Sequence, residues 1–137
     1  METIHATSVS LEGRALLILG PAGSGKSDLA LGMMALGAGL IADDRTVLSV
    51  TEGRLFASCP AALAGRIEAR GIGILACNPA PPAPVVLAID LGQDEAERIP
   101  APRKCTYLGC EIALLHKPAT GNLPAALRLY LKGGLVE

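Results

Sequence analysis

The segment GPAGSGKS at residues 20–27 constrains this chain more than any other feature. It matches the pattern G-x-x-x-x-G-K-[ST] of a phosphate-binding loop, or P-loop, at every defined position. An apolar run at residues 15–19 precedes the segment and a helix-like run at residues 28–31 follows it. Because strand, loop and helix in this order are the context that the pattern requires, the sequence predicts a P-loop rather than a chance glycine-rich turn.

The residue types in this segment have distinct expected tasks. Gly20, Gly23 and Gly25 let the backbone curl around phosphate oxygens, so that its N–H groups point inward as donors. The N-terminus of the following helix adds a partial positive charge. We expect Lys26 to reach the outer phosphates and the Ser27 hydroxyl to hold Mg²⁺.

Length and composition predict one domain over residues 1–137, long enough to bury a core without disulfides. Half of the residues are hydrophobic but only three are aromatic, so the core must be aliphatic. The formal net charge of −1 gives no basic surface for nucleic acid or for an anionic membrane. The apolar stretches are too short to cross a bilayer, and the N-terminus lacks a signal-peptide pattern. The four cysteines form no C-x-x-C pair, so we interpret them as core residues or free thiols of a reducing cytoplasm.

Hydrophobic patterning predicts more strands than helices. The expected strands are residues 3–11, 15–19, 40–42, 46–50, 54–57, 66–69, 85–89, 106–108 and 111–115. One expected helix runs from the P-loop to about Leu36, with Leu29, Met33 and Leu36 on one face, and another covers residues 122–132. A helical turn is expected at 60–64, a proline-rich loop at 79–84 and a charged surface loop at 92–102. So few helices indicate a mixed sheet with a P-loop set into it, rather than a doubly wound fold.

Asp43 and Asp44 follow the expected buried strand at residues 40–42. Two adjacent carboxylates at the end of an apolar strand are costly unless they bind something. Beside a P-loop, one carboxylate could orient Mg²⁺ while the other accepts a proton from an attacking hydroxyl. A solvated turn is the alternative, because aspartate is common where strands end.

Three further places in the sequence carry side chains that could act in catalysis or in ligand binding. Glu68 and Arg70 project from the same face if residues 66–69 are extended, which suits either a metal–phosphate cluster or a plain ion pair. Asp90 ends the apolar run at residues 85–89 and is a rival for the Mg²⁺ role, in the manner of a Walker B acid. His5 could contact a phosphate from the strand beside the P-loop strand, or serve as a structural hydrogen-bonding residue.

Four segments in this order resemble the catalytic domain of the HPr kinase/phosphorylase family: IHAT at residues 4–7, GPAGSGKS at 20–27, LIADD at 40–44 and EARGIG at 68–73. The last segment is similar to the family signature E-[VI]-R-G-[LI]-G, and the resemblance covers roughly residues 4–78. It implies an α/β, P-loop-containing fold similar to phosphoenolpyruvate carboxykinase, with a mixed strand-rich sheet and few helices.

The resemblance also implies an activity. Enzymes of this family use ATP and Mg²⁺ to phosphorylate a serine of HPr, the phosphocarrier of the sugar phosphotransferase system, and they reverse the reaction by phosphorolysis. Family members form hexamers. By resemblance, the nucleotide-binding residues are Gly20, Gly23, Ser24, Gly25, Lys26, Ser27 and Arg70, the metal-associated residues are Ser27 and Glu68, and the catalytic residues are Asp44 or Asp43 together with His5.

The chain departs from the family pattern in two places. Long members carry a separate N-terminal domain, whereas this chain is similar to the short form that starts near the catalytic strand. Residues 119–123 read ATGNL where long members have the basic loop PGRNL, so the arginine is missing. The residues alone leave two other functions open: an ATP-binding regulatory module that transfers nothing, and a small-molecule kinase that uses Asp90.

Overall fold

The structure, a computed structural model, describes residues 1–119 and 121–136. Its helices are α1 (Lys26–Ala35) and α2 (Leu123–Gly133), with a short 3-10 turn η1 (Ala61–Leu63). Its strands are β1 (Glu2–Ile4), β2 (Thr7–Leu11), β3 (Arg14–Leu19), β4 (Gly39–Ala42), β5 (Thr46–Thr51), β6 (Arg54–Ser58), β7 (Arg66–Ala69), β8 (Gly73–Ala76), β9 (Ala83–Glu95), β10 (Arg103–Tyr107) and β11 (Cys110–Pro118). Within the described residues, neither helix is long and apolar enough to cross a membrane.

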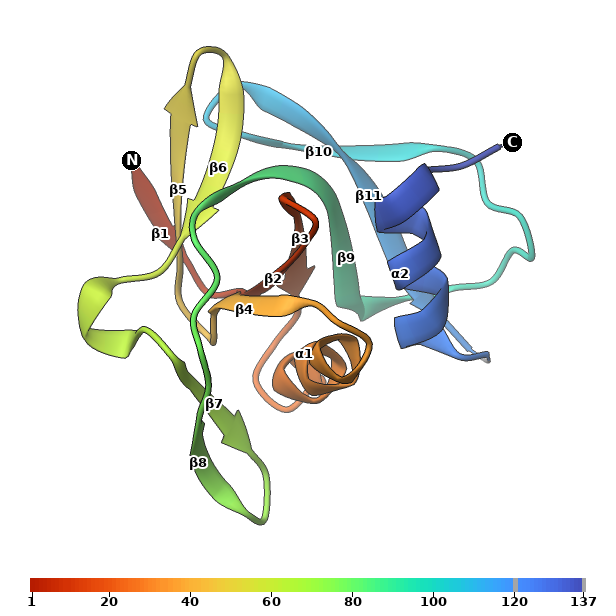
Figure 1. Cartoon of the computed structure of the whole chain (residues 1–137). Coiled ribbons are helices and arrows are strands. Elements are labelled where there is room, and N and C mark those ends of the chain that lie inside the picture. The colour runs from red at the N-terminus through yellow and green to blue at the C-terminus, as the bar shows by residue number, and fades with distance from the viewer. Residues whose placement is uncertain (120, 137) are drawn as a thin grey trace.

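The main sheet is mixed and is built around the long strand β9 (Figure 1). Strand β9 pairs in parallel with β3 and β11, and its first residues pair antiparallel with β6. Antiparallel strands extend the sheet on both sides: β2 and β4 beyond β3, and β10 beyond β11. The ribbon of β1, β5 and β6 continues from β9, whereas β7 and β8 form a separate hairpin that projects from the lower part of the molecule in Figure 1.

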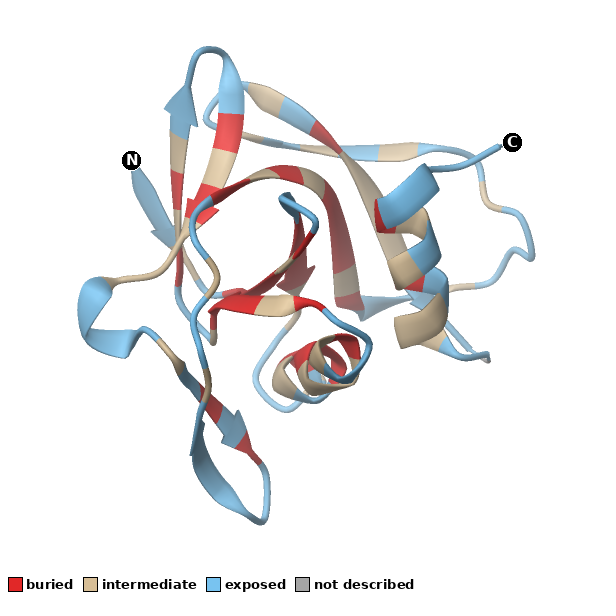
Figure 2. Cartoon of the chain, viewed as in Figure 1, coloured by how far each residue is buried: buried red, intermediate tan, exposed pale blue. Residues whose placement is uncertain are grey.

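Both faces of the P-loop strand β3 are buried, which explains its uninterrupted apolar sequence. Leu16 and Ile18 pack on the side of the two helices, in a core that includes Met33 and Leu127. The alternate residues of β3 pack on the other side, where the β5–β6 ribbon contributes Leu48. Figure 2 shows the buried residues gathered on these central strands and on the inner face of α1. The core is aliphatic, as the composition predicts.

The structure breaks the first predicted strand in two, and the break lies at His5. Strand β1 pairs with β5, whereas β2 turns away after Ala6 and pairs with β3. The hydrogen bond from the Ala6 N–H to the Ile4 carbonyl, 3.0 Å long, marks the bend. His5 therefore lies between two strands rather than within one, which frees its side chain from either sheet face.

Several predicted boundaries were wrong. The predicted loop at 92–102 begins later, because β9 continues to Glu95 by pairing with the end of β11 across an irregularity after His116. The proline-rich loop ends earlier than predicted, since Ala83 and Pro84 already pair with β6. Leu36 is 39% exposed as the residue that ends α1, instead of sharing the buried face of Leu29 and Met33.

Arg14, the first residue of β3, ties the end of α2 to the sheet. Its Nη1 donates to the carbonyl oxygens of Leu131 at 2.7 Å and Lys132 at 3.2 Å, which belong to the last turn of the helix. A cation at a helix C-terminus also opposes the negative end of the helix dipole. We expect Arg14→Ala to lower the free energy of unfolding by about 1–2 kcal/mol, measured by urea denaturation.

The control for this variant is Arg98→Ala. Arg98 is exposed and donates no side-chain hydrogen bond within the described residues. Its removal should change stability by less than about 0.5 kcal/mol. Equal losses in the two variants would show that the helix end does not depend on Arg14.

Glu95 and Arg103 close the loop between β9 and β10. Arg103 Nη1 donates to Glu95 Oε1, and the Glu97 N–H donates to Glu95 Oε2 at 3.1 Å. The Glu97 hydrogen bond, followed by that of Arg103, lowers the pKa of Glu95 from its ordinary value of 4.5. The folded state therefore favours the ionised carboxylate, and this stabilisation is present above the unfolded-state pKa and lost as the pH falls through the folded-state pKa.

We expect the wild type to be more stable than Glu95→Gln at about pH 7, and the difference to shrink at about pH 3. Urea denaturation of both proteins at the two pH values measures it. A difference that stays constant over this range would show that the charge of Glu95 contributes nothing.

Candidate active site

The P-loop joins the end of β3 to the start of α1, and its glycines adopt backbone conformations that other residues rarely take. Gly25 precedes the helix with φ +99°, and Gly20 has φ +143°. A Cβ atom at Gly20 would lie 2.5 Å from Ser24 Oγ, so the loop closes tightly over this position. Because α1 begins at Lys26, the N–H groups of its first turn lie beside the loop without helical partners.

Two polar side chains of the P-loop suit an anionic ligand. Lys26 is only 7% exposed, and its Nζ donates to the carbonyl oxygens of Gly20 at 2.9 Å and Pro21 at 3.2 Å. The Ser24 Oγ is buried with no hydrogen-bond partner among the described residues. An orphaned hydroxyl beside a curled, glycine-lined backbone is what a bound phosphate would satisfy, so the residues present fit a polyphosphate.

Asp43 accepts three hydrogen bonds from three different parts of the chain. Its Oδ1 accepts from Ser27 Oγ at 2.6 Å and from Thr7 Oγ1 at 3.1 Å, and its Oδ2 accepts from the Glu68 N–H at 2.9 Å. The carboxylate therefore links the P-loop, strand β2 and the β7–β8 hairpin. A serine hydroxyl paired with an aspartate next to the P-loop is the arrangement that binds Mg²⁺ in P-loop proteins.

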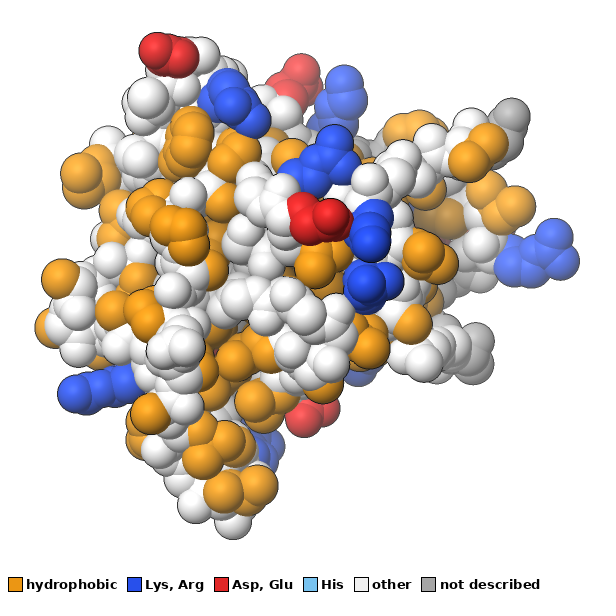
Figure 3. Space-filling view, in the orientation of Figure 1, with side chains coloured by type: hydrophobic (Ala, Val, Ile, Leu, Met, Phe, Trp, Pro, Cys, Tyr) orange, Lys and Arg blue, Asp and Glu red, His pale blue; other side chains and the backbone are white. Residues whose placement is uncertain are grey.

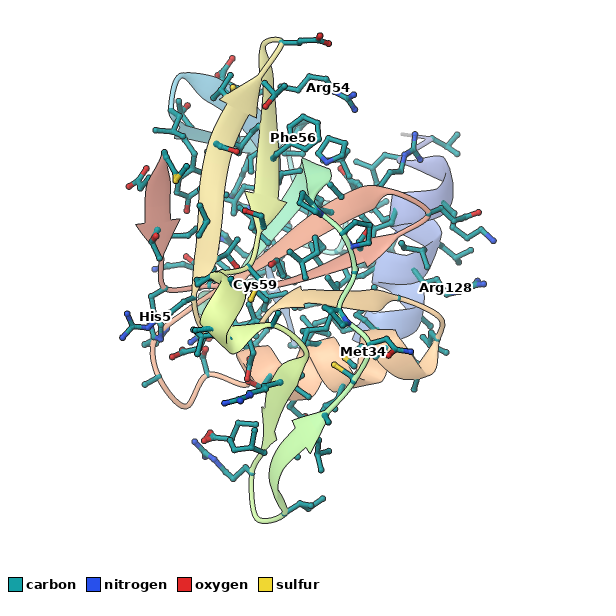
Figure 4. The ribbon with its side chains drawn as sticks, turned by 60° about the vertical axis from the view of Figure 1, so that its left-hand side comes forward. His5, Met34, Arg54, Phe56, Cys59 and Arg128 are labelled. Atoms are coloured by element: carbon teal, nitrogen blue, oxygen red, sulfur yellow. The ribbon has the colours of Figure 1, made fainter. Side chains whose placement is uncertain are left out.

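Asp44 is placed differently, although it is the next residue. Its backbone is left-handed, with φ +68°, and its carboxylate points to His5, whose Nε2 lies 2.5 Å from Asp44 Oδ1. The side chains of Asp44 and His5 are 60% and 53% exposed, so both reach solvent. In Figure 4, His5 stands at the edge of the molecule, on the opposite side from Arg128 of α2. The pair is thus accessible to an incoming molecule.

Thr7 belongs to this arrangement, and sequence reasoning missed it. The side chain is fully buried, its Oγ1 donates to Asp43, and it accepts the Asp44 N–H at 3.1 Å. The pairing of β2 with β4 carries an irregularity between Ser8 and Val9, just before the two aspartates. Such bulges often turn a strand end toward an active site. The signal in the sequence was a hydroxyl within the IHAT segment, two residues after the histidine.

The β7–β8 hairpin forms the opposite wall of the site. Glu68 and Arg70 are exposed on it and do not pair with each other among the described residues, so the ion-pair alternative is not what the structure shows. A Cβ atom at Gly23 would lie 3.8 Å from the Arg70 guanidinium, which therefore sits over the P-loop.

One cleft of about 930 Å³ brings these side chains together. It is lined by His5, Ala22, Gly23, Gly25, Lys26, Ser27, Asp28, Leu31, Asp43, Asp44, Arg45, Leu63, Arg66, Ile67, Glu68, Ala69, Arg70, Ile72 and Ile74. Most of the site residues expected from the sequence thus line one cleft, and Gly20 and Ser24, which do not line it, belong to the same P-loop. The functions assigned to them remain predictions.

Asp90, the rival acid, does not line this cleft. It pairs with Leu19 of β3, and its Oδ1 accepts the Gly92 N–H at 2.8 Å. The ATGNL segment does not line the cleft either within its described residues; Asn122 precedes α2, and Thr120 lies outside the described residues.

Within the described residues, no group of three or more His, Cys, Asp or Glu side chains is arranged to hold a metal ion. A divalent cation here would therefore need oxygen ligands from its phosphates in addition to Ser27 and Asp43. The cysteines are free and half-buried. Burial, and then the negative charge of Asp43, raises the pKa of the Cys77 thiol.

The model of the HPr serine kinase C-terminal domain matches residues 1–80, more than half of the chain, and the match contains the P-loop, both aspartates and Glu68. The chain belongs to the HPr kinase C-terminal domain family. The family resemblance expected from the sequence is confirmed.

Individual proteins similar to this chain are named HPr kinase/phosphorylase. An HPr kinase/phosphorylase of Aromatoleum aromaticum is 31% identical over 155 residues, which cover 98% of this chain and 48% of that protein. An HPr kinase/phosphorylase of Bordetella pertussis is 42% identical over 74 residues, which cover 53% of this chain and 24% of that protein. The chain thus spans half or less of the length of these relatives.

The fold agrees with a solved structure. The HPr(Ser) kinase/phosphatase of Coxiella burnetii matches with a TM-score of 0.81 and 26% identity, over 96% of this chain and 89% of that chain. The expected fold class, a P-loop in a mixed strand-rich sheet with few helices, is confirmed, and it is consistent with the expected likeness to phosphoenolpyruvate carboxykinase.

Proposed function

We propose that this chain is an ATP- and Mg²⁺-dependent protein-serine kinase that phosphorylates an HPr-type phosphocarrier, and that it also reverses the reaction by phosphorolysis. The observation that carries the proposal is that the two adjacent aspartates have different contacts in the same cleft. Asp43 is bound to the P-loop serine, while Asp44 stands open to solvent beside His5 in the same cleft. The names of the relatives support HPr as the acceptor.

The contacts separate the roles that the sequence left open. Asp43 already accepts three hydrogen bonds, so we assign it to holding Ser27 and, with Glu68 nearby, the metal ion. Asp44 accepts from His5 alone among the side chains described, and its exposed carboxylate has lone pairs free for a seryl hydroxyl. We therefore assign Asp44 as the base that takes the seryl proton, with His5 orienting it.

We assign the remaining site residues to binding and orienting the phosphate groups of ATP. Bound MgATP would supply the phosphoryl group and neutralise part of its charge. The P-loop amides, Lys26 and the Ser24 hydroxyl would hold the phosphate oxygens in place, and Arg70 would approach them from the hairpin side. In the reverse direction, Asp44 would return the proton to the seryl oxygen, as microscopic reversibility requires.

The wider setting is also a proposal. We infer that the chain acts in the cytoplasm, that it regulates the sugar phosphotransferase system and carbon metabolism through HPr, and that it forms a homo-oligomer, a hexamer by family resemblance. Neither nucleic acid nor a membrane is expected as a partner.

Transfer of labelled phosphate from [γ-³²P]ATP to purified HPr tests the proposal. Label should appear on HPr in the presence of Mg²⁺ and be absent when the acceptor serine of HPr is replaced by alanine. Added inorganic phosphate should then release the label as pyrophosphate. ATP binding without any transfer would instead favour a regulatory nucleotide-binding module.

A further inference from the structure

The β7–β8 hairpin exposes large apolar side chains next to the proposed active site. Ile72 is 78% exposed, Ile74 64% and Leu75 38%. In Figure 3, hydrophobic side chains gather over this hairpin at the lower end of the molecule. We refer to Ile72, Ile74 and Ala76 as the hairpin surface; Leu75, which pairs with the buried Ile67, lies on the other face of the hairpin. Clustered exposed apolar residues of this kind usually mark a contact with another molecule.

The outer edge of the hairpin is short, four residues long, and carries no charged side chain. Strand β8 pairs with β7 and with no other strand among the described residues, and all four of its residues are exposed. Residues 71–89 contain no charged side chain. Exposed sheet edges are normally guarded by charges, prolines or bulges. An unguarded apolar edge is consistent with a surface that a partner covers.

The hairpin surface is continuous with the cleft that contains Asp44. Ile72 and Ile74 themselves line this cleft. Ile74 pairs directly with Glu68, whose N–H donates to Asp43, so one strand separates the apolar surface from the paired aspartates. A molecule that brings a hydroxyl to Asp44 can therefore contact Ile72 and Ile74 at the same time.

The charges around the same opening indicate the chemistry of that molecule. Arg45, Arg66 and Arg70 line the cleft, and none of them forms an ion pair within residues 1–119 and 121–136. Arg70 lies over the P-loop at Gly23, where we assign it to the phosphates. A protein with an apolar patch and acidic side chains at its border would match both the hairpin surface and the arginines.

We propose that the hairpin surface is the docking site of the protein acceptor, which contacts it through an apolar patch bordered by acidic residues. The proposal rests on the proposed function in taking HPr as that acceptor. Docking here would bring a protein side chain, rather than a free small molecule, to Asp44 and would thereby select a macromolecular substrate.

Direct binding of HPr tests docking separately from phosphate transfer. We would measure the dissociation constant of HPr by titration calorimetry for the wild type and for the Ile72→Glu and Ile74→Glu variants. The matched control is Ile99→Glu, because Ile99 is 74% exposed on the β9–β10 loop and does not line the cleft. Each hairpin variant should weaken HPr binding at least about tenfold, whereas Ile99→Glu should stay within about twofold of the wild type.

The outcomes separate the possible explanations. Thermal denaturation and binding of a fluorescent ATP analogue identify a variant that has lost its fold. Because two hairpin variants are tested, the experiment remains decisive if one of them does not fold. HPr binding that survives in both variants, or no HPr binding to the wild type, overturns the docking proposal. So does a change of oligomeric mass in sedimentation, which would assign the surface to contacts between copies of the chain. Hairpin-dependent HPr binding without phosphate transfer would support docking while refuting the kinase.

Discussion

Asp44→Asn is expected to lower kcat for phosphate transfer by about 10³-fold while the protein still binds ATP. The asparagine has nearly the same shape, and it also tolerates the left-handed backbone that position 44 adopts at φ +68°. What is lost is the negative oxygen that accepts the seryl proton. Single-turnover transfer to HPr measures the effect, and binding of a fluorescent ATP analogue shows whether the P-loop is intact.

Asp43→Asn is the comparison that separates the two carboxylates. Asp43 holds Ser27, Thr7 and the Glu68 N–H, so its substitution should raise the Mg²⁺ concentration needed for activity and lower the melting temperature. Asp44→Asn should do neither, because Asp44 is exposed and contacts one side chain. If Asp43→Asn abolished transfer at saturating Mg²⁺ and Asp44→Asn left it intact, the assignment of the base would be reversed.

Gly20→Ala is expected to weaken ATP binding at least about 30-fold. The new Cβ would lie 2.5 Å from Ser24 Oγ and 3.4 Å from the Gly92 nitrogen, at a φ of +143°. The loop must therefore shift and lose the curvature that aims its N–H groups and the Ser24 hydroxyl at phosphate. Equilibrium titration with a fluorescent ATP analogue measures the loss.

Gly13→Ala is the matched control for this substitution. Gly13 also has a positive φ, +77°, but a Cβ atom there meets no heavy atom within 4 Å. Its substitution should cost about 1 kcal/mol of stability and leave ATP affinity unchanged, because the β2–β3 turn lies outside the cleft. Equal ATP affinities for the two variants would contradict a phosphate-binding role for the tight turn at Gly20.

The parts of the site that follow each other along the chain could be predicted from the sequence. Strand, P-loop and helix over residues 15–35 form one local unit whose motif specifies its geometry. The long-range contacts could not be predicted in the same way. His5 meets Asp44 across 39 positions, and this contact depends on the bend between β1 and β2, which periodicity does not reveal.

The wrong boundaries have a similar origin. The charged residues after Asp90 are typical of a loop, yet the pairing of Lys117 with Asp94 and of Pro118 with Glu95 keeps them in β9. Strand β8 was not expected, because it begins with Gly73, closely follows Gly71 and contains no buried residue. In both cases a neighbouring strand, rather than local propensity, determines the structure.

Strand β9 contributes to both hydrophobic cores of the protein. This strand pairs with β6, β3 and β11, and it supplies Leu87 and Ile89 to the helix-side core and Val85 and Ala88 to the other. Both cores therefore depend on the same strand. A substitution that disturbs β9 should therefore weaken both cores at once, on the side of the helices and on the side of the β5–β6 ribbon.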